Sequence, residues 1–465
     1  MHKFKNLQFE RRMSMEKLNL LRDKESKVFF HYLIPAICST LVTSVYLLVD
    51  TLIIGQGVGA LGISALNIFM PFFLIFNGLG LLFGIGSGIL ISAEDGMGNK
   101  KKSNQYFITG LVSVVSLALV LSLIWNHYLE SLCVFLGAND DTIGLVLEYG
   151  KCIMMFAPVF IMSNYLAPII RNMKNPKLVM CGVLTGSFLN IILDYVFVFP
   201  MDMGMFGAAL ATVIGSVTTV LVLSTHFIKK QNRVKINKET ISLKLVTPIL
   251  KCGFSSLIME VANGFVIFIF NIQILKYIGN NGIVVYGIIS NCVLVGLALF
   301  NGVAQAAQPI IATNFGAKEN TRVKKVLKYA MITTTIIGIS LFAVVFLFTG
   351  QVIQIFVKAN AEILSVGIPA LRLYLSAFCI MNINILISGY FQSVGKEKIA
   401  IYVSIVRGFL LNIILAFVLP SVLPATILWA IVPLSELITL IGIAFYAKNS
   451  STIENTALNK EFISA

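Results

Sequence analysis

The sequence predicts an all-α polytopic membrane protein with twelve transmembrane helices arranged as two pseudo-symmetric six-helix lobes. Three observations predict this fold class: an apolar composition, a series of hydrophobic windows of membrane-spanning length, and an internal repeat. Of the 465 residues, 57% are hydrophobic and only 12% are charged, and the mean hydropathy is +0.89. Soluble domains carry roughly a quarter charged residues, so this composition indicates a membrane protein.

Twelve windows of about 20 apolar residues, the length that crosses about 30 Å of hydrocarbon, follow one another along the chain. Several exceed the minimum length, so we expect tilted helices. The first window is too long for the core of a signal peptide, and we interpret it as a retained helix. The windows lie near residues 28–53, 64–91, 105–127, 141–163, 178–199, 207–228, 245–275, 283–311, 326–349, 363–390, 399–419 and 425–447.

Basic residues gather in alternate connections between these windows, whereas the intervening connections hold only Lys276 and Lys358. Cytoplasmic loops of membrane proteins collect Lys and Arg, so the alternation predicts a cell-membrane protein with both termini in the cytoplasm. It also accounts for the net charge of +14 without nucleic-acid binding. The basic connections hold eight Lys and Arg in residues 1–27; Lys100 to Lys102; Arg171, Lys174 and Lys177; six from Lys229 to Lys244; Lys318, Arg322, Lys324 and Lys325; and Lys396 and Lys398.

The chain repeats itself at an offset of about half its length. AEDGMGNKKKSN, which begins at Ala93, has a counterpart in TNFGAKENTRVK, which begins at Thr313, an offset of 220 residues. LNIIL begins at Leu189 and occurs again at Leu411, an offset of 222. Six spans per repeat predict a parallel repeat, whose lobes place a substrate between them for alternating access; duplication kept for packing alone is the alternative. The predicted parts are a tail (1–27), a lobe (28–228), a linker (229–243), a second lobe (244–448) and a tail (449–465).

Two carboxylates stand inside apolar spans, Asp50 in the first and Asp194 in LNIILDYVFVFP of the fifth. An Asp at the centre of a membrane helix costs about 2.5–3.5 kcal/mol and marks an ion or proton path by default. Asn190 lies on the same helical face as Asp194, and Thr212 lies in the next span. These oxygens suit a proton or Na⁺. The alternatives are a bond to a helix terminus for Asp50 and an interhelical contact for Asp194.

Several motifs together resemble the multidrug and toxic compound extrusion (MATE) family. They are VDTLIIGQGVGALGISALN, LNIILDYVF after RNMKNP, GMFGAALATVIG, and QAAQPIIATNFGAKE, and the resemblance covers roughly residues 28–447. The branch it resembles most is the one typical of Gram-positive bacteria and clostridia, which includes drug-efflux members. The resemblance implies a V-shaped fold of two six-helix lobes.

The resemblance also implies roles for particular residues. Members hold a cation site in the first lobe, whose residues fall on Asp50, Asn190, Asp194 and Thr212. Pro35 falls where some members bend the first helix when the site is protonated.

The second lobe departs from the family pattern. An acid of the seventh helix would align near Asn263, but Glu260 stands three residues earlier, and an acid of the tenth helix has no counterpart between Ala370 and Gly389. The resemblance therefore leaves a second cation site open.

Four further polar residues lie in the spans of the second half, and we consider them tentative residues of a substrate cleft. Glu260 either attracts a cationic substrate or caps a neighbouring helix. Arg407 either forms an ion pair with a carbonyl or acid or takes part in transport. Gln305 and Gln308 either bond across helices or contact substrate.

The function that the resemblance implies is cation-coupled antiport, with H⁺ or Na⁺ driving export of drugs or other organic, often cationic, compounds by a monomer embedded in membrane lipids. A flippase for a lipid-linked precursor is the alternative, although it needs a wide basic cavity. No P-loop is present, so an ion gradient must supply the energy. The seven cysteines stand singly and no catalytic constellation is present, so neither a cofactor nor an enzyme is predicted.

Overall fold

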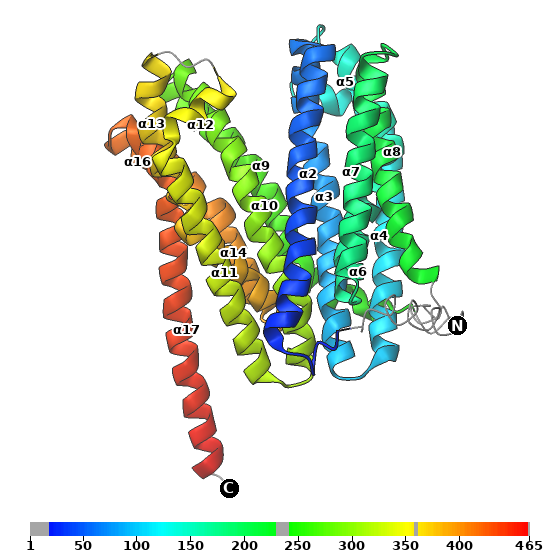
Figure 1. The fold of residues 1–465 in the computed structure, drawn as a ribbon, viewed down its shortest axis with the longest axis vertical. Helices are drawn as coiled ribbons and strands as arrows, with labels where there is room; N and C mark the ends of the chain where they lie inside the picture. The colour runs from blue at the N-terminus through cyan, green and yellow to red at the C-terminus, as the bar shows by residue number, and fades with distance from the viewer. Residues whose placement is uncertain (1–17, 229–240, 358–360, 464–465) are drawn as a thin grey trace, which may run out of the picture.

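The computed structural model describes residues 18–228, 241–357 and 361–463, and every regular element within these ranges is helical. Figure 1 shows two bundles side by side. The first, which we call the N lobe, contains α2 (Glu25–Gly57), α3 (Ala60–Gly96), α4 (Lys100–Phe135), α5 (Ile143–Met155), α6 (Ala157–Asn172), α7 (Pro176–Val198) and α8 (Gly204–Ser224), followed by the short 3₁₀ helix η1 (Thr225–Ile228).

The second bundle, the C lobe, begins after the linker, of which residues 229–240 lie outside the described residues. α17 runs on through most of the predicted carboxy-terminal tail. The C lobe contains η4 (Leu243–Leu245), α9 (Val246–Tyr277), α10 (Asn280–Gly316), α11 (Asn320–Leu347), α12 (Thr349–Phe356), α13 (Ala361–Leu375), α14 (Phe378–Ser393), α15 (Glu397–Ile405), a π-helical turn η5 (Val406–Leu410), α16 (Leu411–Val422), η6 (Ala425–Ala430) and α17 (Ile431–Ile463).

Eleven helices of the described residues are long and apolar enough to cross a membrane, and a bent pair makes twelve when it counts as one span. The pair is α5 and α6, which meet at 55°. Pro158 stands in the first turn of α6 and has no N–H to donate to the carbonyl of Met154. The Ser122 hydroxyl donates to that carbonyl instead, at 2.7 Å, so the break leaves no orphaned acceptor there.

The internal repeat is visible in the turns as well as in the sequence. Gly59 and Gly279 adopt φ of 91° and 87° and each precedes a long helix. Gly98 and Lys318 adopt φ of 79° and 63° in the turns that follow those helices. Both pairs are 220 residues apart, so the two halves share backbone conformation where left-handed residues are required.

Helix α2 belongs to both lobes. Its first part, with Val28, Tyr32 and Ala36, lies in the hydrophobic core of the C lobe together with residues of α10, α11 and α13. Ile54, near its other end, lies in the core of the N lobe. Movement of one lobe relative to the other must therefore displace or bend α2.

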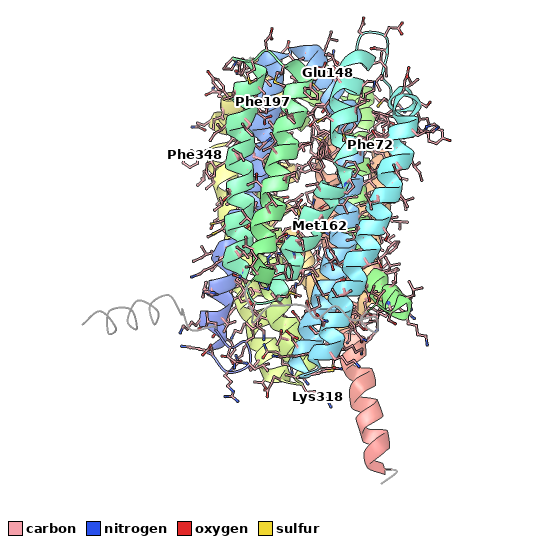
Figure 2. The ribbon with its side chains drawn as sticks, turned by 90° about the vertical axis from the view of Figure 1, so that its right-hand side faces the viewer. Phe72, Glu148, Met162, Phe197, Lys318 and Phe348 are labelled. Carbon is pink, nitrogen blue, oxygen red and sulfur yellow. The ribbon has the colours of Figure 1, made fainter. Side chains whose placement is uncertain are left out.

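The lobes meet closely at the end that carries the basic connections, here called the basic end. A Cβ on Gly96 would lie 2.0 Å from the carbonyl oxygen of Thr313, and one on Gly316 would lie 2.1 Å from that of Ala93. Toward the opposite end the two bundles diverge (Figure 1). Figure 2 shows Lys318 at the basic end and Glu148 at the opposite end. The structure is a V closed at the basic end.

Candidate functional site

Two polar clusters lie in equivalent places of the two lobes. The first cluster is formed by side chains of α2, α7 and α8, which pack against one another in the N lobe. α7 and α8 cross closely where Gly186 faces Gly215, because a Cβ on either glycine would lie under 3 Å from the backbone oxygen of the other. This crossing holds Asn190 of α7 next to α8, and its Nδ2 donates to Thr212 Oγ1 at 3.4 Å. Thr212 Oγ1 in turn donates to the Ala208 carbonyl oxygen at 3.0 Å.

The two predicted carboxylates converge on this cluster. Asp50 of α2 is 6% exposed, Asp194 of α7 is fully buried, and their side chains interact with each other. The structure thus brings together all four residues that the sequence nominated for the first lobe.

The cluster contains more buried acceptors than donors. Asp50 Oδ1, Asn190 Oδ1 and both carboxylate oxygens of Asp194 are buried without a hydrogen-bond donor. Two carboxylates without a proton offer only acceptors to each other, and unsatisfied buried oxygens are costly. The arrangement fits a proton shared between the carboxylates, or a small hard cation held by carboxylate and amide oxygens. Among the described residues no group of three or more His, Cys, Asp or Glu side chains gathers as a metal site.

Sequence reasoning missed two tyrosines beside the carboxylates. Tyr46, one turn before Asp50 on α2, and the buried Tyr149 of α5 both interact electrostatically with Asp50 and Asp194, and Tyr149 also contacts Thr212. The four-residue spacing from Tyr46 to Asp50 was a usable signal. Nothing in the sequence pointed to Tyr149.

Pro35 lies inside α2, which runs without interruption from Glu25 to Gly57. The proline lacks the N–H that would bond one turn earlier, which weakens the helix at this point. Ser39 Oγ donates to the Pro35 carbonyl at 2.7 Å. Pro35 therefore lies between the start of α2, which packs into the C lobe, and the part that carries Asp50, and Ala36 directly after it still lies in the C-lobe core.

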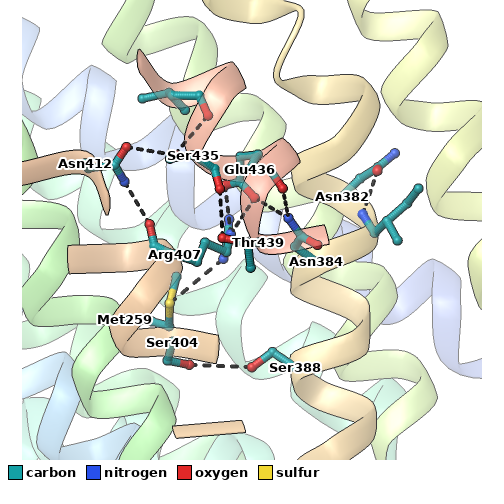
Figure 3. A network of polar contacts seen from close by, with 12 residues as sticks. Met259, Asn382, Asn384, Ser388, Ser404, Arg407, Asn412, Ser435, Glu436 and Thr439 are labelled. Atoms are coloured by element: carbon teal, nitrogen blue, oxygen red, sulfur yellow. Dashed lines mark hydrogen bonds and ion pairs between the residues drawn. The ribbon is translucent and has the colours of Figure 1, made fainter. Parts of the chain in front are cut away.

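The second cluster lies in the C lobe and contains Asn412, which is offset from Asn190 by 222 residues. Asn412 accepts a hydrogen bond from Ser435 at 2.9 Å (Figure 3), and in the first cluster Asn190 is bonded to Thr212. The position equivalent to Asp194 is Ala416. The cluster consequently has no counterpart of that carboxylate.

The second cluster contains a positively charged side chain of the protein itself, Arg407. Arg407 Nε donates to both carboxylate oxygens of Glu436, at 2.7 and 2.9 Å, and both residues are at most 5% exposed (Figure 3). Asn384 Nδ2 donates to Glu436 Oε2 at 2.7 Å, and Asn412 Nδ2 bonds the Arg407 carbonyl across the π-helical turn. The guanidinium of Arg407 is thus directed at Glu436 and, through Nη1, at Met259 Sδ. The two glutamines of α10 lie elsewhere: Gln308 is buried and donates to Gln392 at 3.2 Å, whereas Gln305 is partly exposed.

Glu260 is placed differently. It lies on the face of α9 that packs on α3, next to Gly78, and it has no hydrogen bond or ion pair within the described part of the chain. Gly264, one turn later, still contacts Leu74 of α3. Beyond that point the same face lines a pocket of about 450 Å³, formed by Phe268, Asn271, Ile272, Leu275, Asn280 and Ile283. We call this face of α9, from Glu260 to Leu275, the cleft face.

Comparisons with known proteins agree with this geometry. A family model described as MatE matches residues 35–196 and again residues 256–418, an offset of 221 between the two starts. Multidrug export protein MepA of Staphylococcus aureus (strain MSSA476) is 26% identical over 437 residues, which cover 93% of this chain and 96% of that protein. A solved structure described as a MATE transporter in complex with MaL6 superposes with a TM-score of 0.88 at 21% identity, covering 95% of this chain and 100% of the other. A structure described as the outward-facing conformation of a multidrug resistance MATE family transporter also gives 0.88 at 21% identity, covering 95% and 99%.

Proposed function

The chain belongs to the multidrug and toxic compound extrusion family, whose members are membrane transporters and not enzymes, and we propose that it exports organic, often cationic, compounds in exchange for H⁺ or Na⁺. The observation that carries the proposal is the set of buried, unpaired acceptor oxygens on Asp50, Asn190 and Asp194. Such a set needs a positive charge, and the helix that supplies Asp50 also reaches the other lobe.

Either coupling ion satisfies the cluster. A proton on Asp194 gives it a donor toward Asp50 and removes one of two adjacent negative charges. A sodium ion is held by the same carboxylates together with the Asn190 amide oxygen and the Thr212 hydroxyl. One elementary charge crossing 100 mV supplies about 2.3 kcal/mol, and one pH unit supplies about 1.4 kcal/mol, so either gradient can drive export.

Occupancy of the cluster acts on the lobes through α2. Binding a cation strengthens the contact of Asp50 with α7 and α8, whereas the part of α2 before Pro35 stays packed in the C lobe. A straight and a bent form of α2 then favour different lobe arrangements. Because coupling is reciprocal, a drug that binds better to one arrangement changes cation affinity by the same factor.

The cleft face supplies the substrate site. Glu260 is a carboxylate with no partner in the described part of the chain, and it lies among apolar side chains, a combination that attracts organic cations. With the basic end in the cytoplasm, as the distribution of Lys and Arg favours, the V opens to the outside. The protein then acts as a single chain in the cell membrane, with both termini cytoplasmic, and releases its substrate outward.

The charge distribution argues against the flippase alternative. A lipid-linked precursor carries phosphate and needs a basic cavity, but Arg407 is neutralised by Glu436 and the cleft face carries a carboxylate.

Transport by purified protein in liposomes tests the proposal. We expect export of a fluorescent cationic dye when a proton or sodium gradient is imposed, and loss of that export in Asp50→Asn and Asp194→Asn at matched protein levels. Thr185→Ser, on an exposed face of α7, is the control and should transport normally. Export that persists in both Asn variants would show that the carboxylates do not couple transport.

A further inference from the structure

Arg171 is a buried cation at the basic end, and no described side chain supplies it with a counter-charge. The sequence placed Arg171 in a basic connection, but it lies in the last turn of α6 and is 5% exposed. Among the described residues, no carbonyl or carboxylate accepts a hydrogen bond from it, and its one electrostatic neighbour is Tyr32 of α2. A buried Arg normally has an acceptor, because an unpaired charge away from water is strongly disfavoured.

Tyr32 also lacks a hydrogen-bond partner among the described residues. Its side chain is 1% exposed, and its hydroxyl is buried without a hydrogen-bond partner. The guanidinium can only donate hydrogen bonds and the hydroxyl can donate one, so the two side chains together present donors that need an acceptor.

In the second half of the chain, the residue equivalent to Arg171 has its hydrogen bonds satisfied by the protein itself. IIRNMKNPK at 169–177 aligns with YFQSVGKEK at 390–398, and the two turns share a left-handed residue, Lys174 at φ 67° and Gly395 at φ 71°. Arg171 therefore corresponds to Gln392, at an offset of 221 residues, and Tyr32 corresponds to Cys252, at an offset of 220.

Gln392 is fully bonded by its own lobe. Its Nε2 donates to the Cys252 carbonyl oxygen and to Ser256 Oγ, both at 3.1 Å, and its Oε1 accepts from Gln308 at 3.2 Å. The first half has a cation in place of this amide, and none of the residues that the structure describes accepts a hydrogen bond from it. The difference between the repeats indicates that the missing acceptor comes from outside the chain.

The surroundings favour an anion as that acceptor. His31, next to Tyr32 in the sequence, experiences the positive charges of Lys27 and Lys177. No Asp or Glu of the described residues interacts with Arg171. A planar guanidinium beside a hydroxyl donor is the usual arrangement for a phosphate oxyanion, which takes parallel hydrogen bonds from Arg.

We propose that Arg171 and Tyr32 form a binding site for a phosphate oxyanion at the basic end, between α6 and α2. The phosphate belongs either to the headgroup of an anionic phospholipid or to a soluble phosphate. The site is separate from the cation cluster and does not depend on the proposed transport activity.

Two binding measurements on the full-length protein test the site and separate the two sources. The first is thermal unfolding in detergent with inorganic phosphate against chloride at equal ionic strength. The second is native mass spectrometry of lipid retained from nanodiscs of phosphatidylglycerol against phosphatidylcholine. We expect phosphate to raise the melting temperature if the ligand is soluble, and selective retention of phosphatidylglycerol if it is a headgroup.

Three variants attribute the binding. Arg171→Gln, which copies the residue of the second half, should weaken binding by about tenfold or more, because it removes the charge and the fork of donors. Tyr32→Phe keeps the buried ring and should weaken binding by about fivefold, so it tests the site even if Arg171→Gln fails to fold. Lys174→Gln removes an exposed charge three residues away and should change neither readout.

The site is absent if the native protein responds to neither phosphate nor phosphatidylglycerol. It is also refuted if Lys174→Gln weakens binding as much as Arg171→Gln does, since the effect would then come from general basic charge.

Discussion

Removing the negative charge of Glu436 should destabilise the C lobe much more than it changes any contact with substrate. In Glu436→Gln the side chain keeps its shape, but Arg407 remains charged, at most 5% exposed, and without a carboxylate. Breaking a buried ion pair by removing one partner costs about 3–5 kcal/mol. At about 2 °C per kcal/mol for a large chain, the melting temperature should fall by about 6–10 °C.

Removing both charges should restore most of that loss. In the double variant Arg407→Met with Glu436→Leu no buried charge is left, and Asn384 Nδ2 keeps a bond to the backbone oxygen of residue 436. We expect a melting temperature within about 3 °C of the native protein. Glu260→Gln is the matched control for thermal stability, because it makes the same chemical change at a carboxylate that has no partner among the described residues.

Thermal unfolding in detergent and dye export in liposomes, measured on the same preparations, decide the role of Arg407. We expect a large loss of thermal stability in Glu436→Gln and export per folded molecule close to native. Native stability in Glu436→Gln, together with lost export in Arg407→Met, would refute it and assign Arg407 to the substrate.

Three further predictions concern the cation cluster, the closed end and the bent span. Asn190→Ala removes an amide oxygen from the cluster. If Na⁺ is the coupling ion, the sodium concentration needed for half-maximal transport should rise by at least about tenfold; if H⁺ is the coupling ion, proton-driven export should stay nearly unchanged. Equal loss of export under both gradients would contradict a ligand role for Asn190. In Gly316→Leu the new side chain cannot fit beside the Ala93 carbonyl, so the two lobes should separate at the basic end. A cysteine introduced at residue 260 should then become accessible to thiol reagents added from the basic end. Unchanged accessibility would show that this contact does not close the lobes. Ser122→Ala leaves the Met154 carbonyl without its side-chain donor and should lower stability by about 1 kcal/mol in thermal unfolding, whereas Ser116→Ala on the same helix should not.

Local sequence signals predicted the architecture because membrane spans are encoded by continuous apolar windows and the repeat by direct identity. The bend between α5 and α6 was missed, although Pro158 marks it, because a hydropathy window averages over a single proline. Arg171 was assigned to a connection for the same reason: it stands next to a basic turn, and burial of one side chain at a helix end has no local signature.

The candidate site was predictable in its members but not in its geometry. Asp50 and Asp194 each stood out as an acid in an apolar window, yet only the packing of α2 on α7 brings them together. Tyr149 had no such signal, because tyrosine is common in apolar helices. Glu436 is also an acid in an apolar window and was not predicted; the fold shows its role by placing Arg407 opposite it.

The glycine contacts at the basic end have a consequence for the origin of the chain. Gly96 touches Thr313, and Gly316 touches Ala93, so each half offers the other the same surface that it receives. This mutual exchange defines an isologous interface, the kind that two identical subunits form about a twofold axis. A six-helix ancestor with this surface would have closed into a symmetric dimer before its gene was duplicated and fused. Fusion of two such halves leaves each free to differ: the first carries an acid at residue 194, whereas the second carries Ala416 and has Arg407 in its own cluster.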